Sequence, residues 1–70
     1  MTVIVTPLDD FSFRFAVACA IDRIAASVGL RPDELTPTPS LAERLETELR
    51  AQQARVSVTD GDTLLVARPD

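Results

Sequence analysis

The chain contains no histidine and only one cysteine, Cys19, and this excludes several common chemistries. Without histidine, no serine or cysteine can be activated by an imidazole base. One cysteine excludes an internal disulfide, and a zinc site would have one sulfur ligand and no imidazole ligand. With Gly29 and Gly61 as the only glycines, no glycine-rich loop can hold a phosphate. These absences argue against an enzyme and against a bound metal or cofactor, and they indicate no small-molecule substrate.

Lysine, tryptophan and tyrosine are also absent. Arginine supplies all seven positive side chains against eleven acidic ones, so the net charge is −4, and neither half of the chain is basic. A nucleic-acid-binding domain usually carries a basic patch. The three phenylalanines all lie within residues 11–15, so no other ring is available to stack on single-stranded bases. The composition therefore argues against nucleic-acid binding, and arginine without lysine, with abundant alanine, points to a GC-rich bacterial or phage genome.

Long hydrophobic segments are missing as well. The apolar run near the N-terminus is only Val3–Val5, and no basic region precedes it, unlike a signal peptide. The apolar stretch 10–28 is too short and too charged to span a bilayer. A free cysteine without a secretion signal is typical of a cytoplasmic protein, and we expect no membrane association.

The small size of the chain favours self-association. Residues 1–70 form one domain, and 46% of them are hydrophobic. A chain of this length buries only about 60% of its unfolded surface. Metals, disulfides or oligomerisation usually stabilise such small domains. Because the first two are excluded, we expect a homodimer.

Residues 10–28 are predicted to form the central helix. Asp9, Asp10 and Ser12 are alternative N-caps, and Gly29 can adopt the left-handed conformation that ends a helix. Apolar residues recur at helical spacing along one face. These residues are Phe13, Val17, Ile21, Ile24 and Val28.

The same helix is apolar beyond that face. Nothing is polar between Phe15 and Ile21, and a helix this apolar is expected to be covered on more than one side. Phe11 and Phe15 extend the apolar face on one flank, which makes them candidate contacts to a second subunit. Cys19 has no nearby base or cation that would activate it, so we expect a buried, slowly reacting thiol.

Residues 2–6 are predicted to form a strand. Residues 30–39 are predicted to form a proline-rich loop in which Pro32–Leu35 can form one helical turn.

Residues 40–54 are predicted to form a second helix, starting at Ser40 because prolines 37 and 39 disfavour an earlier start. Ser40 and Glu43 match a capping box. The apolar stripe of this second helix is narrow, and Glu46 and Arg50 stand at the i,i+4 spacing of an ion pair. The candidate partner-facing charges of this helix are Glu43, Glu46 and Arg50.

Residues 55–67 are predicted to form a hairpin, because Asp60-Gly61 separates two β-branched runs. A three-residue loop, 59–61, would place Val56 opposite Leu64 and Val58 opposite Asp62. A two-residue loop would instead place Val58 opposite Thr63. The first register is preferred because it lines one face with apolar residues. These residues are Val56, Val58, Leu64 and Val66.

Together these elements predict a small α+β domain of order β-α-α-β-β. We expect a three-stranded, antiparallel-type sheet with both helices on one face; a winged-helix-like arrangement is the alternative. The other sheet face would stay uncovered, and the homodimer would form across it or by strand pairing at a sheet edge. The candidate interface residues are Ile4, Leu65, Phe11 and Phe15.

The function that these observations favour is a non-catalytic protein–protein interaction module, regulatory or accessory, acting as a homodimer. Two alternatives stay open. One is a small acidic inhibitor, of the kind that phages encode, which binds a basic nucleic-acid-binding protein by charge. The other is a winged-helix regulator that binds DNA.

Overall fold

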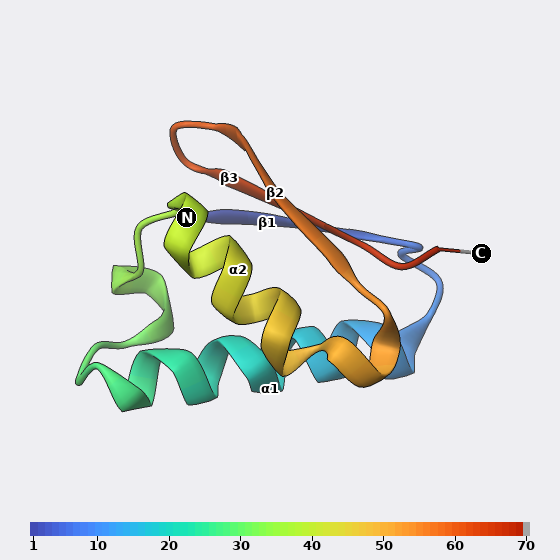
Figure 1. Cartoon of the computed structure of the whole chain (residues 1–70), viewed down its shortest axis with the longest axis horizontal. Coiled ribbons are helices and arrows are strands. Elements are labelled where there is room, and N and C mark those ends of the chain that lie inside the picture. The colour runs from blue at the N-terminus through green and yellow to red at the C-terminus, as the bar shows by residue number, and fades with distance from the viewer. Residues whose placement is uncertain (70) are drawn as a thin grey trace.

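The computed structural model describes residues 1–69. The elements along the chain are β1 (Thr2–Thr6), α1 (Phe11–Ser27), η1 (Pro32–Glu34), α2 (Pro39–Glu48), η2 (Arg50–Gln52), β2 (Arg55–Asp60) and β3 (Thr63–Ala67), in which η1 and η2 are single 3-10 turns (Figure 1). The α+β class and the β-α-α-β-β order of the main elements are confirmed. No helix in residues 1–69 combines the length and the apolar character needed to cross a membrane.

The three strands form one mixed sheet in the order β1-β3-β2. The β2 and β3 strands pair antiparallel as a hairpin, whereas β1 pairs parallel with β3. The expectation of an antiparallel-type sheet was therefore right only for the hairpin. Figure 1 shows the reason: each main element runs opposite to the one before it, in the order β1, α1, α2, β2 and β3. The first and the fifth, β1 and β3, therefore run in the same direction. Because β3 is also paired with β1, the hairpin is part of the three-stranded sheet.

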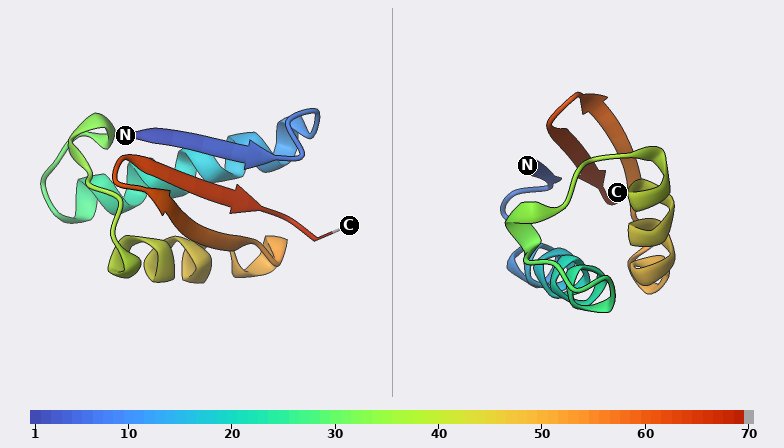
Figure 2. Two further views of the ribbon diagram at one scale, coloured as in Figure 1. Left: turned by 90° about the horizontal axis from the view of Figure 1, so that it is seen from above. Right: turned by 90° about the vertical axis from the view of Figure 1, so that its left-hand side faces the viewer.

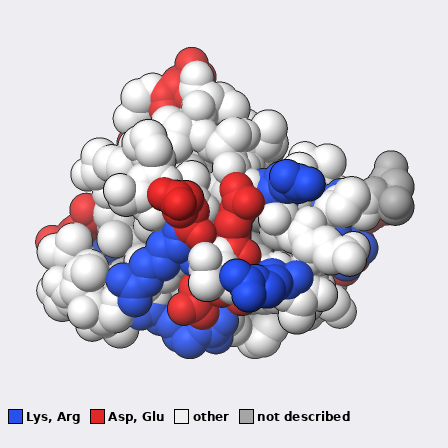
Figure 3. Space-filling view, in the orientation of Figure 1, with Lys and Arg blue, Asp and Glu red and all other residues white. Residues whose placement is uncertain are grey.

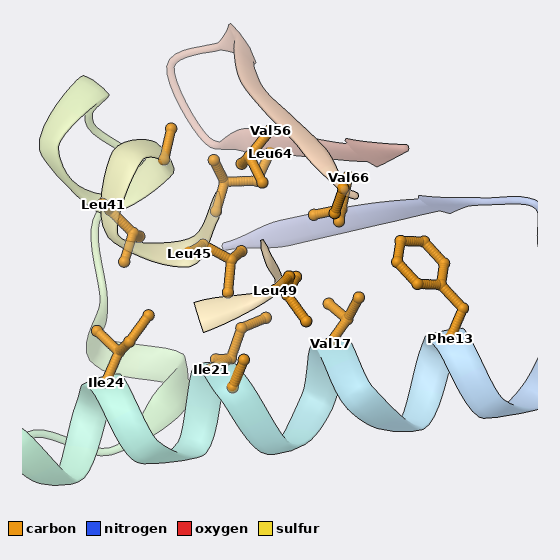
Figure 4. Close-up of a cluster of buried hydrophobic side chains, with 13 residues drawn as sticks. Phe13, Val17, Ile21, Ile24, Leu41, Leu45, Leu49, Val56, Leu64 and Val66 are labelled. Carbon is orange, nitrogen blue, oxygen red and sulfur yellow. The ribbon is translucent and has the colours of Figure 1, made fainter. Parts of the chain in front are cut away.

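Both helices lie on one face of the sheet, as the end-on view in Figure 2 shows. The core forms between α1, α2 and that face, and the side chains in Figure 4 point into this space. Each large apolar side chain buried there stabilises the fold by about 1.5–3 kcal/mol. The largest fully buried side chains are Phe13, Leu45, Leu64, Val17 and Val66.

The hairpin register differs from both expected registers. Val56 pairs with Val66, and Val58 pairs with Leu64. The ladder then shifts by one residue between Val58 and Asp60, which is a β-bulge that absorbs an extra residue. The preferred register was displaced by two residues, and a displacement of two leaves every side chain on the same face. The apolar face was therefore assigned correctly, although Val58 at its end is 36% exposed.

The ends of α1 follow from its capping residues. Of the three possible N-caps, Asp10 is the one used, and its side chain accepts a hydrogen bond from Phe13 N at 3.0 Å. At the other end, Gly29 has φ +74°, and Leu30 N donates to Ala25 O at 2.9 Å, which closes the helix with a left-handed turn. The helix spans Phe11–Ser27, one residue shorter at each end than expected.

The start of α2 was predicted wrongly. The helix begins at Pro39, and the N-cap is Thr38, whose hydroxyl accepts from Leu41 N at 3.1 Å. Proline is favourable at the first helical position, and it holds the preceding residue extended. Thr38, at φ −135° and ψ 160°, is thus in the conformation of an N-cap. Ser40 lies inside the helix, so its capping box with Glu43 does not form.

The second helix is also shorter than the expected 40–54. It ends at Glu48, and the chain continues as the 3-10 turn η2. Gln53 then adopts a left-handed conformation with φ 57°, which redirects the chain into β2. A 3-10 turn also forms at Pro32–Glu34, inside the segment for which one helical turn was expected.

Candidate interaction surface

The outer face of α1 exposes two of the three phenylalanines. Phe11 is 70% exposed and Phe15 is 61% exposed, whereas Phe13 between them is 0% exposed. Side chains two positions apart on a helix point in directions that differ by about 200°. Because Phe13 points into the core, Phe15 points toward solvent. Ala18 is exposed one turn further along. We call Phe11, Phe15 and Ala18 the α1 patch; no other element of the same chain covers it, and its coverage by a second subunit stays a prediction.

The two exposed rings form an ordered pair. Their centroids lie 6.3 Å apart and their planes differ by 20°, which is a stacked arrangement. The guanidinium carbon of Arg14 lies 5.9 Å from the centroid of Phe11, within cation–π range. Leu8, on the turn before the helix, is also exposed, at 68%. Burying one phenylalanine side chain contributes about 1.5–3 kcal/mol, so this surface has a large potential for association.

The N-terminus of α1 is anchored to the sheet, which fixes the position of the patch. The Asp10 carboxylate pairs with Arg68, which follows β3, in addition to capping the helix. Arg68 also lies over the ring of Phe13, 5.2 Å from its centroid. The hydrogen bond from Phe13 N lowers the pKa of Asp10 most, and the charge of Arg68 lowers this pKa further. Sequence spacing gave no sign of the pair between Asp10 and Arg68, because 58 residues separate its partners.

Acidic side chains flank the α1 patch along the helix. Asp9 precedes Phe11, and Asp22 follows Ala18 by one turn; both are exposed. Neither carboxylate has an ion-pair partner within 4.0 Å among residues 1–69. Cys19 lies one helical turn after Phe15 and is half-buried, which is less than the burial expected for it; its slow reaction stays a prediction.

The outer face of the sheet carries the other two candidate interface residues. Ile4 and Leu65 are neighbours in the parallel pairing of β1 and β3, and they alternate along their strands with Val3 and Leu64, which pack in the core. They therefore lie on the sheet face that points away from the two helices, whose common side Figure 2 shows. Ile4 is 45% exposed and Leu65 is half-buried. The structure thus brings Ile4 together with Leu65, and Phe11 together with Phe15. It places the two pairs on opposite sides of the molecule, one on the sheet and one on α1.

The charged residues of α2 do not form the expected ion pair. Glu46 is half-buried and turns toward β2, where Oε2 accepts from Val56 N at 3.3 Å. Arg50 lies beyond the end of the α2 helix, in η2, and is exposed. Glu43 is also exposed. Figure 3 shows acidic and basic side chains side by side on this face of the molecule, so the surface has no single sign of charge.

An open hollow of about 600 Å³ lies beside η2 and the start of β2. It is lined by both acids and arginines, among them Glu43, Glu46, Arg50 and Arg55. In the part of the chain that the structure describes, no three carboxylate or thiol side chains gather as metal ligands would. The hollow can accept polar groups of either charge, whereas the α1 patch offers ordered apolar surface.

No protein-family model, no curated protein and no solved structure matches this chain.

Proposed function

We propose that the domain is a non-catalytic protein-interaction module that binds a partner protein through the α1 patch. The observation that carries this proposal is the exposure of Phe11 and Phe15, at 70% and 61%, on the solvent side of α1. Single exposed apolar residues are ordinary on protein surfaces, but adjacent large ones mark interaction sites. Aromatic side chains also supply much of the binding energy in protein interfaces.

The local structure supports this role because it presents the rings in a fixed arrangement. Phe11 and Phe15 stack on each other, and the helix that carries them is held to the end of β3 by Asp10 and Arg68. A surface ordered before binding loses less conformational entropy when the partner arrives. The fold itself does not require the two exposed rings, since the core is filled from the opposite face of α1.

The partner that fits this surface is an amphipathic helix with basic residues near both ends. The α1 patch is a narrow apolar strip along a helix, and such a strip matches apolar residues at i, i+3, i+4 and i+7 of a second helix. Asp9 and Asp22 lie beyond the two ends of the strip and are exposed. Their charges would attract lysine or arginine on the partner and set its position along α1.

The proposal is tested with displayed peptides. A library of 16-residue peptides is selected on the wild-type protein and counter-selected on a Phe11→Ser/Phe15→Ser variant. We expect enriched peptides with helical apolar spacing and basic flanks. Fluorescence anisotropy should show at least about tenfold weaker binding to the double variant.

Val28→Ser is the matched control, because Val28 is 53% exposed at the opposite end of α1 and lies outside the patch. This variant should bind the selected peptides as the wild type does. Peptides that bind the double variant equally well, or a selection that enriches no such sequence, would refute the proposal. Sedimentation gives the remaining outcome: if Phe15→Ser converts a dimer to a monomer, a second copy occupies the patch and the partner helix proposed above is wrong.

A further inference from the structure

The two edges of the sheet differ in how they are protected. The β1 and β2 strands are the edges, because the order is β1-β3-β2. An exposed edge presents unpaired amides and carbonyls that can pair with another strand. At the β2 edge, the Glu46 carboxylate accepts a hydrogen bond from the backbone N–H of Val56, and a bulge interrupts the strand before Asp60. Both features are means by which proteins block edge pairing.

The β1 edge has neither form of protection. Its five residues carry no charge and no proline, and its pairing with β3 is regular from Thr2 to Thr6. Thr2 N donates to Asp62 O at 2.8 Å, and Thr6 O accepts from Arg68 N at 3.0 Å, so these even-numbered residues direct their backbone groups toward β3. Because successive residues of a strand direct them to opposite sides, the amides and carbonyls of Val3 and Val5 face outward.

The sequence of β1 reads the same in both directions. It is Thr-Val-Ile-Val-Thr, with Ile4 at the centre. A two-fold axis beside Ile4 would therefore place Val3 opposite Val5 of a second copy and Thr2 opposite Thr6. The outward amides and carbonyls of Val3 and Val5 would meet those of the second copy in hydrogen-bonded pairs. Matched β-branched pairs are favourable across antiparallel strands, and an isologous dimer requires such self-complementarity.

We propose that two copies of this chain pair antiparallel along β1 and form one continuous six-stranded sheet. The edge contains no charge that its symmetry mate would repel. The Ile4 side chains of the two copies would be adjacent on the outer sheet face, beside Leu65 of each copy. The proposal rests on the backbone of β1 and uses no residue of the α1 patch, and it would give the assembled protein two such patches.

The size of the contact sets the expected affinity. A strand of five residues is about 17 Å long, so strand pairing alone buries less than the roughly 1,200 Å² of a standard interface. We therefore expect a dimer that dissociates on the order of micromolar concentration. Sedimentation velocity over a range from about 1 to 500 micromolar spans that transition.

The direct structural test is a nuclear Overhauser effect between the Hα atoms of Thr2 and Thr6. These two residues form a non-hydrogen-bonded pair across the proposed interface, where Hα atoms come close. Within one chain they lie roughly 13 Å apart, too far for such a signal. Hydrogen exchange at Val3 and Val5 should slow as protein concentration rises, because only pairing shields these amides. A signal that is absent at 500 micromolar, with fast exchange at both valines, would overturn the proposal.

Ile4→Lys tests the two-fold axis, since it places two like charges next to each other only in this dimer. We expect the dimer dissociation constant to rise at least about tenfold. Leu65→Lys is the control: it puts the same charge on the same face, but the two copies of position 65 would lie roughly 14 Å apart, beyond a Debye length at physiological salt. Far-UV circular dichroism and the exchange rate of the backbone amide at position 4 report whether each variant is folded.

The pattern of results separates this proposal from the other surfaces. Loss of the dimer in Ile4→Lys and its retention in Leu65→Lys supports edge pairing. Loss in both variants indicates packing across the outer sheet face, and retention in both places the dimer elsewhere; either result refutes the inference. The Phe11→Ser/Phe15→Ser variant should remain dimeric, so failure of the α1 patch as a binding site would leave the β1 dimer intact.

Discussion

Phe13 and Phe15 lie two residues apart on α1, and their environments are opposite. Phe13 is 0% exposed in the core, whereas Phe15 is 61% exposed on the solvent side. The inner face of the helix is explained by folding, because its side chains fill the space between α2 and the sheet. The outer face is not explained in that way. The difference identifies which aromatic residues are available for binding, and substitutions at the two faces should have opposite consequences.

The largest effect is expected at the inner face. Phe13→Ala should lower the free energy of unfolding by about 3–5 kcal/mol, through lost burial and the cavity left behind. For a domain of this size, a change this large removes most of the stability. Urea denaturation followed by circular dichroism measures it. A loss below about 1 kcal/mol would contradict the position of Phe13 in the core.

A smaller effect extends the comparison to the start of α2, where two hydroxyl residues again lie two positions apart. Thr38 caps the helix and Ser40 does not. Thr38→Ala should therefore cost about 1 kcal/mol, whereas Ser40→Ala should leave the denaturation midpoint nearly unchanged. The reverse order would mean that the helix starts at Ser40 after all.

The contact between Asp10 and Arg68, which holds the start of α1 to the end of β3, should make the free energy of unfolding depend on pH. Asp10 has a pKa below its ordinary value of 3.8, because Phe13 N and Arg68 favour the charged form. Its contribution to stability is therefore present above about pH 3.8 and is lost as the pH falls through the lower pKa of the folded state. Asp10→Asn keeps a capping oxygen but cannot ionise. It should be less stable than wild type at neutral pH and approach wild type in acid; a constant difference between the two proteins from neutral pH into acid would contradict this role.

Much of the fold followed from the residues themselves. Apolar spacing located α1 and its buried face, and alternation placed Val56, Leu64 and Val66 on the inner face of the sheet although the pairing was displaced by two residues. The parallel pairing of β1 with β3 was not predicted, because it depends on the directions of both helices and not on any local pattern. The start of α2 was missed because Pro39 was taken as a barrier, whereas it is the first residue of the helix and holds Thr38 as its cap.

The candidate site was predicted in part. Phe11 and Phe15 were selected as interface candidates, but as a flank of one apolar face that also includes Phe13; the helical angle of about 200° between Phe13 and Phe15 already places them on opposite sides. Ile4 and Leu65 were correctly placed on the uncovered sheet face. The contact between Asp10 and Arg68 joins distant parts of the chain, so local sequence could not reveal it. The role of Glu46 at the β2 edge was missed for the same reason.

The smallest expected effect on stability gives the most direct test of the central claim, that the outer face of α1 serves binding and not folding. Phe11→Ser/Phe15→Ser is measured twice, by urea denaturation and by affinity for the selected peptides. Exposed substitutions usually change stability by no more than about 0.5 kcal/mol each. We predict a nearly unchanged free energy of unfolding and at least about tenfold weaker peptide binding. A loss of stability comparable with that of Phe13→Ala, or unchanged affinity, would contradict the account.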